Sequence, residues 1–117
     1  MKRLGMLAAA AAAVAAIAAG NGGAATPKLQ AVVSDPVNIS LTFRGQKVTT
    51  LKAGQYTVVV RDTASDHDFH LSGPGVNRRT TVGGTGTSRW NVTLRRGTYK
   101  YVCDPHSTFM KGSFTVK

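Results

Sequence analysis

A cysteine, a histidine and a methionine lie within one short stretch near the C-terminus. Cys103 and His106 are three residues apart, and Met110 follows four residues later. A thiolate, an imidazole and a thioether together suit a soft, redox-active metal, and copper is the first candidate. Cys103 is also the only cysteine of the chain, so it has no partner for an internal disulfide. The stretch therefore predicts a copper site built largely on one loop.

A metal held by one loop alone would be poorly constrained, so a further ligand should come from elsewhere in the chain. The remaining histidines are His67 and His70. Three residues apart on an expected strand, they would point to opposite faces, and only one could reach the metal. We predict His67, because it begins that strand beside the polar segment 63–66. The predicted metal ligands are thus His67, Cys103, His106 and Met110.

The rest of the chain is typical of an all-β domain. Short runs of β-branched and aromatic residues are separated by Gly, Pro, Asp and Asn, and no helical period of useful length occurs after the first 25 residues. Seven short strands favour a β-sandwich, and the segment 72–76 is expected to be a loop. The expected strands are Gln30–Val33, Val37–Phe43, Tyr56–Asp62, His67–Leu71, Thr87–Leu94, Thr98–Cys103 and Gly112–Val116.

Alternation in two of these strands indicates which side chains enter the core. Trp90 and Leu94 share one face of their strand, with charged and polar residues on the other. In the next strand Tyr99, Tyr101 and Cys103 share a face. The cysteine therefore continues a line of large apolar side chains at the point where the strand ends. We expect its thiol at one end of the core.

The first 25 residues have the layout of a secretory signal peptide. Lys2 and Arg3 precede an apolar run, Leu7–Ala19, and small residues follow it. We expect residues 1–25 to direct export to the periplasm or the exterior, and residues 26–117 to form one domain. Without cleavage, the segment would be a short membrane anchor; after cleavage, no stable membrane insertion is expected.

The chain is strongly basic. It contains 15 Lys and Arg against five acidic residues, and loss of Lys2 and Arg3 would lower the formal charge from +10 to +8. Such a field can steer an acidic partner or hold a protein near an anionic membrane, although ordinary solubility explains it equally well. The scattered basic residues and the expected export argue against nucleic acid as a partner.

Three short runs of residues carry a resemblance to a known family. With the sequences His67–Leu71, Tyr101–His106 and Met110–Gly112, the chain resembles the cupredoxins, and among them the small blue copper proteins of the plastocyanin and amicyanin type. The resemblance implies a Greek-key β-sandwich and one type 1 copper ion. It also implies that His67, Cys103 and His106 are the strong ligands and that Met110 is a weak axial ligand.

By the same resemblance, the protein would be a monomeric carrier of single electrons between redox partner proteins, and not an enzyme. Partners, acidic ones among them, would dock near His106, with Pro105, Phe109 and Pro74 as its apolar neighbours. The main alternative is a periplasmic copper carrier or storage protein. Zinc is disfavoured by Met110, and a nucleophilic cysteine enzyme by the lack of an evident third group or oxyanion site.

One position departs from the family pattern. Asp68 stands where the family usually has Asn, and a carboxylate accepts hydrogen bonds but donates none unless it is protonated. If Asp68 lies close to Asp104, repulsion between like charges should raise the pKa of one of them. The redox potential would then depend on pH.

Overall fold

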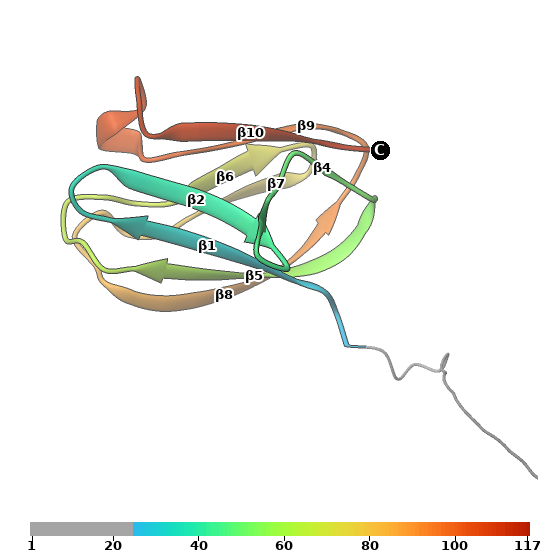
Figure 1. Cartoon of the computed structure of the whole chain (residues 1–117), viewed down its shortest axis with the longest axis horizontal. Helices are drawn as coiled ribbons and strands as arrows, with labels where there is room; N and C mark the ends of the chain where they lie inside the picture. The colour runs from blue at the N-terminus through green and yellow to red at the C-terminus, as the bar shows by residue number, and fades with distance from the viewer. Residues whose placement is uncertain (1–24) are drawn as a thin grey trace, which may run out of the picture.

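The computed structural model describes residues 25–117, so nearly all of the expected signal peptide lies outside the described residues. The described chain forms two five-stranded sheets packed face to face (Figure 1). Its one described helix is a single 3-10 turn, η2 (Asp104–His106). Across residues 25–117, no helix is long and apolar enough to cross a membrane. The expected all-β, Greek-key sandwich of the cupredoxin type is confirmed.

The first sheet has the strand order β3-β2-β1-β5-β8. β1 and β5 are parallel, whereas the other neighbours are antiparallel. Its strands are β1 (Lys28–Ser34), β2 (Asn38–Phe43), β3 (Gln46–Lys47), β5 (Gly54–Asp62) and β8 (Gly86–Leu94).

The second sheet has the order β4-β10-β9-β6-β7. Here β4 and β10 are parallel and the remaining pairs antiparallel. Its strands are β4 (Thr50–Leu51), β6 (His70–Gly73), β7 (Val76–Arg79), β9 (Gly97–Val102) and β10 (Lys111–Val116).

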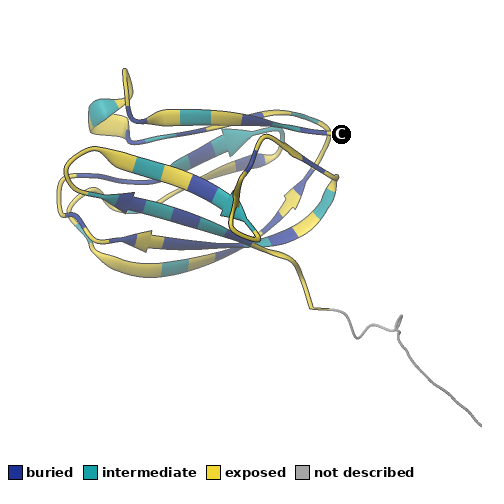
Figure 2. Ribbon diagram, viewed as in Figure 1, coloured by how far each residue is buried: buried dark blue, intermediate teal, exposed yellow. Residues whose placement is uncertain are grey.

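The core lies between the sheets, where the inward-facing residues of both gather (Figure 2). The predicted alternation is confirmed in β8, where Trp90, Val92 and Leu94 are buried and their neighbours exposed. Burial of these apolar side chains is the main force that holds the sheets together. Aromatic rings from the second sheet stack in pairs, with Tyr99 and Phe114 centroids 5.3 Å apart.

The predicted strand His67–Leu71 begins only at His70. His67, Asp68 and Phe69 are all buried, so they do not alternate between faces. The segment is instead a loop that enters the end of the sandwich. Its backbone is held by Thr80, whose hydroxyl accepts from Phe69 N–H at 3.0 Å and whose own N–H donates to Phe69 C=O at 3.1 Å.

The segment 72–76, predicted to be a loop, is part of a tight hairpin between β6 and β7. The strand β7 was not predicted because its exposed Asn77, Arg78 and Arg79 give no apolar signal. Gly73 is required in this hairpin, since a Cβ there would collide with the ring of Tyr99.

Four connections lie at one end of the sandwich, at the left of Figure 1. They are the turn between β1 and β2, the loop from β5 to β6, the loop from β9 through η2 to β10, and the loop from β7 to β8. The first expected ligand lies in the second of these loops and the others in the third. The topology therefore brings two distant parts of the sequence to the same end of the core.

Candidate metal centre

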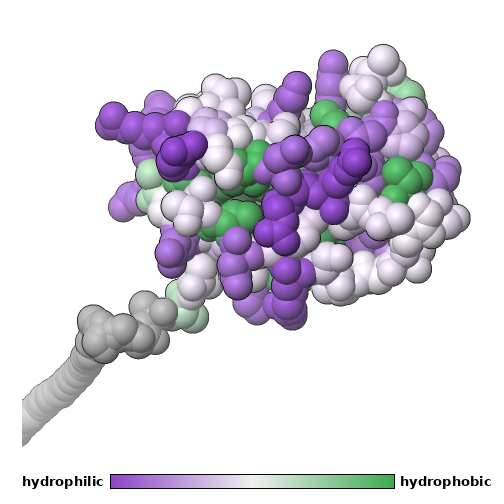
Figure 3. Space-filling view, turned by 180° about the vertical axis from the view of Figure 1, so that it is seen from behind, coloured by the Kyte–Doolittle hydropathy of each residue, from purple (hydrophilic) through white to green (hydrophobic). Residues whose placement is uncertain are grey.

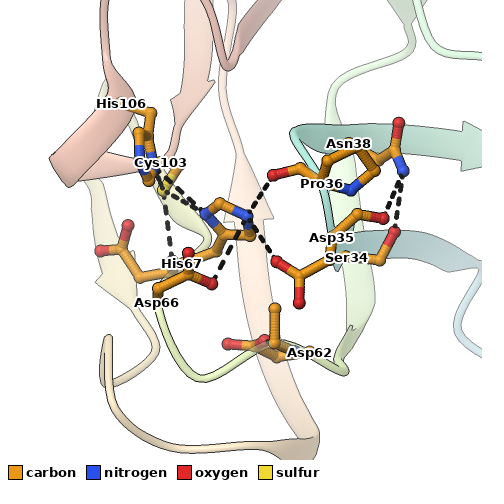
Figure 4. Close-up of polar contacts among 11 residues, drawn as sticks. Ser34, Asp35, Pro36, Asn38, Asp62, Asp66, His67, Cys103 and His106 are labelled. Atoms are coloured by element: carbon orange, nitrogen blue, oxygen red, sulfur yellow. Dashed lines mark hydrogen bonds and ion pairs between the residues drawn. The ribbon is translucent and has the colours of Figure 1, made fainter.

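Three ligand atoms from the two loops face one another (Figure 4). Cys103 Sγ lies 3.6 Å from His67 Nδ1 and 3.5 Å from His106 Nδ1. The two Nδ1 atoms are 3.2 Å apart. The centre of a triangle with these sides lies about 2 Å from each atom, which is a metal-to-imidazole bond length. The three side chains thus frame a space that fits one metal ion.

The orientation of the His67 ring is fixed from its other side. Nε2 lies 2.9 Å from the carbonyl oxygen of Pro36, in the turn between β1 and β2 (Figure 4). A carbonyl only accepts, so Nε2 carries the proton and Nδ1 keeps a free lone pair toward Cys103. The carboxylates of Asp35 and Asp66 also approach Nε2, at 3.3 and 3.7 Å. Sequence reasoning missed these contacts, because nothing in the sequence ties the first turn to residue 67.

Cys103 lies at the end of the core, as its place in the strand pattern predicted. It is fully buried, and its sulfur accepts a hydrogen bond of 3.5 Å from the backbone N–H of Asp68. Burial raises the pKa of the thiol, and backbone N–H groups of Asp68 and His106 act in the opposite direction. A coordinated metal removes the thiol proton outright, so binding at this site would release a proton.

The ligand loop is closed by its own backbone. His106 N–H donates to Cys103 C=O at 3.0 Å, and Met110 N–H donates to His106 C=O at 2.9 Å. Cys103 N–H in turn donates to Met110 C=O at 2.9 Å. Met110 is fully buried and begins the return into β10. These bonds hold the positions of Cys103, His106 and Met110 relative to one another before any metal binds.

Asp68 joins the two loops. It is buried, and its Oδ1 accepts a hydrogen bond of 2.6 Å from the backbone N–H of Asp104. The Asp68 carboxylate therefore links the β5–β6 loop to the ligand loop by accepting this hydrogen bond. Burial first, and then the contact with Asp104, raises the pKa of Asp68 to about 6. The pKa of Asp104 is lowered, by the hydrogen bond to Asp68 and then by His70. One of the two pKa values is thus raised, as predicted, with burial as the larger cause.

His70 does not join the cluster. Its Nδ1 lies 3.0 Å from both carboxylate oxygens of Asp104, and its Nε2 lies 2.6 Å from Asn77 Oδ1. Burial lowers the pKa of His70, but the hydrogen bonds to Asp104 and Asn77 outweigh it and raise the pKa. Both ring nitrogens face side-chain oxygens, so these contacts favour the protonated ring and brace the loop.

The outer edge of the site is partly apolar. Phe109 is 58% exposed, and its ring centroid lies 5.5 Å from that of His106, which is itself only partly buried. The prediction that Pro74 lies beside His106 is wrong. The carbonyl of Pro74 accepts a hydrogen bond from Tyr99 O–H, and its ring lies against Gly97 at the opposite end of the sandwich. The error followed from treating the segment 72–76 as a loop of unknown position.

Comparison with known proteins places the chain in a family. Residues 32–117 match the model of the copper-binding proteins of the plastocyanin/azurin family. The chain belongs to that family. Comparison with curated proteins finds no match.

Among solved structures, this plastocyanin/azurin family member is similar to rusticyanin. A reduced rusticyanin structure is 21% identical, with a TM-score of 0.57 and 81% of each chain covered. Rusticyanin from Thiobacillus ferrooxidans is 23% identical, with a TM-score of 0.56, and the match covers 81% of this chain and 79% of the other. At these identities the likeness supports the fold.

Copper is the cofactor of this family, and the donor set found here fits it. His67, Cys103 and His106 are arranged as in a type 1 copper site, with two imidazoles and one thiolate in a trigonal group. Members of the family generally transfer electrons to redox partner proteins, and they are typically exported or periplasmic.

Proposed function

We propose that this protein carries single electrons between redox partners through one type 1 copper ion. His67, Cys103 and His106 would be its strong ligands, and Met110 its weak axial ligand. The observation that carries the proposal is the triangle of Nδ1, Nδ1 and Sγ atoms, with sides of 3.2 to 3.6 Å. Bound copper supplies reversible one-electron chemistry.

The surroundings of the ligands favour electron transfer because they restrict movement. The carbonyl of Pro36 fixes the ring of His67, and the backbone bonds of the ligand loop fix Cys103 and His106. A rigid site imposes one compromise geometry on Cu(I) and Cu(II), so little has to move when an electron passes. The N–H of Asp68 on the sulfur would contribute to the potential, because hydrogen bonds at that sulfur tune it.

Electrons would enter and leave at the edge of His106. This ring is the most accessible of the three expected strong ligands, since His67 is 1% exposed and Cys103 0%. The exposed ring of Phe109 beside it offers an apolar contact for a partner. We therefore place transient docking of a redox partner protein on this surface.

The charge of that docking surface does not favour a strongly acidic partner. Exposed carboxylates of Asp35, Asp66 and Asp104 lie at this end of the domain. These carboxylates offset the positive charge of the basic side chains near them, so the net positive charge of the protein lies away from this end. We propose that apolar contact around His106 and Phe109, rather than attraction to an acidic partner, determines docking there.

An optical and electron paramagnetic resonance spectrum of the copper-loaded protein tests the proposal. We expect an intense visible charge-transfer band, and we expect it to vanish and return over repeated cycles of reduction and oxidation without loss of metal. A protein that binds only Cu(I) and passes it to a chelator would instead be a copper carrier. Burial of His67, Cys103 and Met110 favours retention of the metal over exchange.

We also propose that residues 1–25 direct export and that the mature domain is a monomer without enzymatic activity. The mass of the protein recovered from the periplasm or the medium would test the cleavage site. A mature N-terminus at residue 26 is expected, and the full-length mass in a membrane fraction would contradict cleavage.

A further inference from the structure

Seven of the 13 Lys and Arg residues in 26–117 lie at the end opposite the candidate metal centre. Their exposed side chains come from the start of β1, the turn from β2 together with β3, the segment after β4, the turn from β8 to β9, and residue 117. We call them the basic end: Lys28, Arg44, Lys47, Lys52, Arg95, Arg96 and Lys117.

Backbone and ring contacts make the basic end one continuous surface. Arg44 lies over the ring of Phe43, which contacts Tyr56 edge to face. Tyr56 O–H donates to the carbonyl of Lys52 at 2.8 Å. The backbone of Lys117 then bonds to both neighbours of Lys52, at 3.0 Å each. The two arginines after β8 adjoin it, since Gly97 pairs with Val116.

No acidic side chain offsets these charges. All five aspartates of the chain, Asp35, Asp62, Asp66, Asp68 and Asp104, lie in the loops or strand termini at the metal end. Seen from behind, hydrophilic side chains project at the end of the domain where the described chain begins, and others cross the middle of the same face (Figure 3). The field of the protein is therefore polarised along its strands, with the positive excess at one end.

We propose that the basic end binds an anionic lipid surface peripherally, with the metal end facing away from it. Clusters of four to eight Lys and Arg are the usual feature of proteins that bind anionic membranes by charge. The first strand begins at Lys28, which belongs to the basic end. An uncleaved leader would therefore attach the protein to the membrane through the same end that anionic lipid attracts. The apolar surface at Phe109 would remain accessible from solution.

A membrane is a better candidate than nucleic acid as the ligand of the basic end, for two reasons. The seven side chains are spread over five separate segments of an end surface rather than along one helix or groove. The chain also begins with features of an export signal, which would remove it from nucleic acid.

Sedimentation with lipid vesicles tests this surface, using residues 26–117 with or without copper. The domain should bind vesicles that contain phosphatidylglycerol and not vesicles of phosphatidylcholine alone. Binding should weaken strongly between about 0.05 and 0.5 M salt, because the attraction is screened. Absence of binding to the anionic vesicles at low salt would overturn the proposal. So would equal binding to both lipids.

Two triple variants with the same charge change separate the basic end from net charge. Lys47→Gln, Lys52→Gln and Arg96→Gln together should weaken binding about 100-fold, because each basic residue near an anionic surface contributes about fivefold. The matched control replaces Arg61, Arg89 and Lys100, which are exposed but lie elsewhere. It should bind within about threefold of the original protein. Equal loss in both variants would show that only the net charge matters.

Hydrogen exchange on the vesicles then reports orientation independently of copper. Amides in the turns 44–47 and 95–97 should be protected on binding, whereas those of residues 104–109 should not. Protection at 104–109 would contradict the proposed orientation. A soluble DNA duplex is added as a competitor at the same phosphate concentration as the vesicles. Equal competition would show a general polyanion site and overturn the lipid assignment.

Discussion

The two ends of the sandwich use ionisable side chains in opposite ways. At the metal end the two ionisable groups that hold the loops together are buried: His67 and Asp68 are each 1% exposed, and each is held by backbone groups. At the basic end the charged groups are exposed and share one sign. A buried polar group must be satisfied within the protein, so it fixes geometry, whereas an exposed charge acts through its field. One end is therefore suited to chemistry and the other to association.

The two ends also differ in where the net charge of the protein lies. Composition gives the total charge but not its position. The chain folds so that all five aspartates lie near the metal end, which leaves the excess of Lys and Arg at the other. An acidic protein attracted by the overall charge would be steered toward the end farther from His106. The proposed docking at His106 and the proposed lipid contact would thus use different surfaces.

The largest expected effect comes from removing the sulfur at the metal end. Cys103→Ser should abolish the intense visible band of the copper-loaded protein, because that band is charge transfer from a thiolate and a serine hydroxyl cannot supply it. Absorbance after loading with Cu(II) measures the effect. Ser107→Ala, in the exposed part of the same loop, is the matched control and should keep the band. A blue Cys103→Ser protein would disprove the assignment of Cys103.

A smaller effect is expected at the axial position. Met110→Leu keeps the volume of a fully buried side chain, so the fold should persist. Copper should stay bound and the reduction potential should rise, because loss of the thioether removes a donor that stabilises the oxidised metal. Voltammetry together with metal analysis checks both statements, with the exposed Thr108→Ala as control. Loss of the metal would mean that Met110 is more than a weak ligand.

Much of the metal end could be predicted because its residues lie close together in sequence. Cys103, His106 and Met110 share one loop, and the alternation of β9 placed the thiol at the end of the core. The position of His67 was predicted for a partly wrong reason. It lies in a loop rather than at the start of a strand, because its segment enters the core without alternating.

Contacts across long sequence distances could not be predicted. The bond from His67 to Pro36 joins residues 31 apart, and nothing local marks either partner. The basic end draws on five segments between residues 28 and 117. Such features depend on the order of strands in the sheets, and this order cannot be inferred from a single sequence by its local patterns. The parallel pairing of β1 with β5 is the part of that order which sets Pro36 against the later loop.

Replacement of Asp68 tests whether burial of a charge weakens the metal end. The folded pKa of about 6 lies above the usual 3.8 of an unfolded Asp. Such a group opposes folding where it is ionised, so its contribution becomes unfavourable as the pH rises from about 4 to about 6. Asp68→Asn keeps an acceptor for Asp104 N–H and should gain on the order of 1 kcal/mol relative to the original protein over that range.

Urea denaturation of the metal-free proteins at several pH values measures this difference. Asp66→Asn is the matched control, since it makes the same change at a carboxylate of the same loop that is 64% exposed. If the difference in unfolding free energy between the original protein and Asp68→Asn stays constant between pH 4 and pH 7, burial of the Asp68 charge does not affect stability.

The smallest effect is expected at His70, which separates bracing from ligation within the metal end. Its pKa is raised in the folded protein, so its stabilising contribution is complete below the unfolded value of about 6.5 and is lost as the pH rises through the folded pKa. His70→Gln should therefore lower stability by less than about 1 kcal/mol near pH 6 and by less near pH 9, because the pair with Asp104 is partly exposed. The visible spectrum should not change. A bleached protein would mean that His70 reaches the metal when copper binds, and that the distances among His67, Cys103 and His106 do not describe the loaded site.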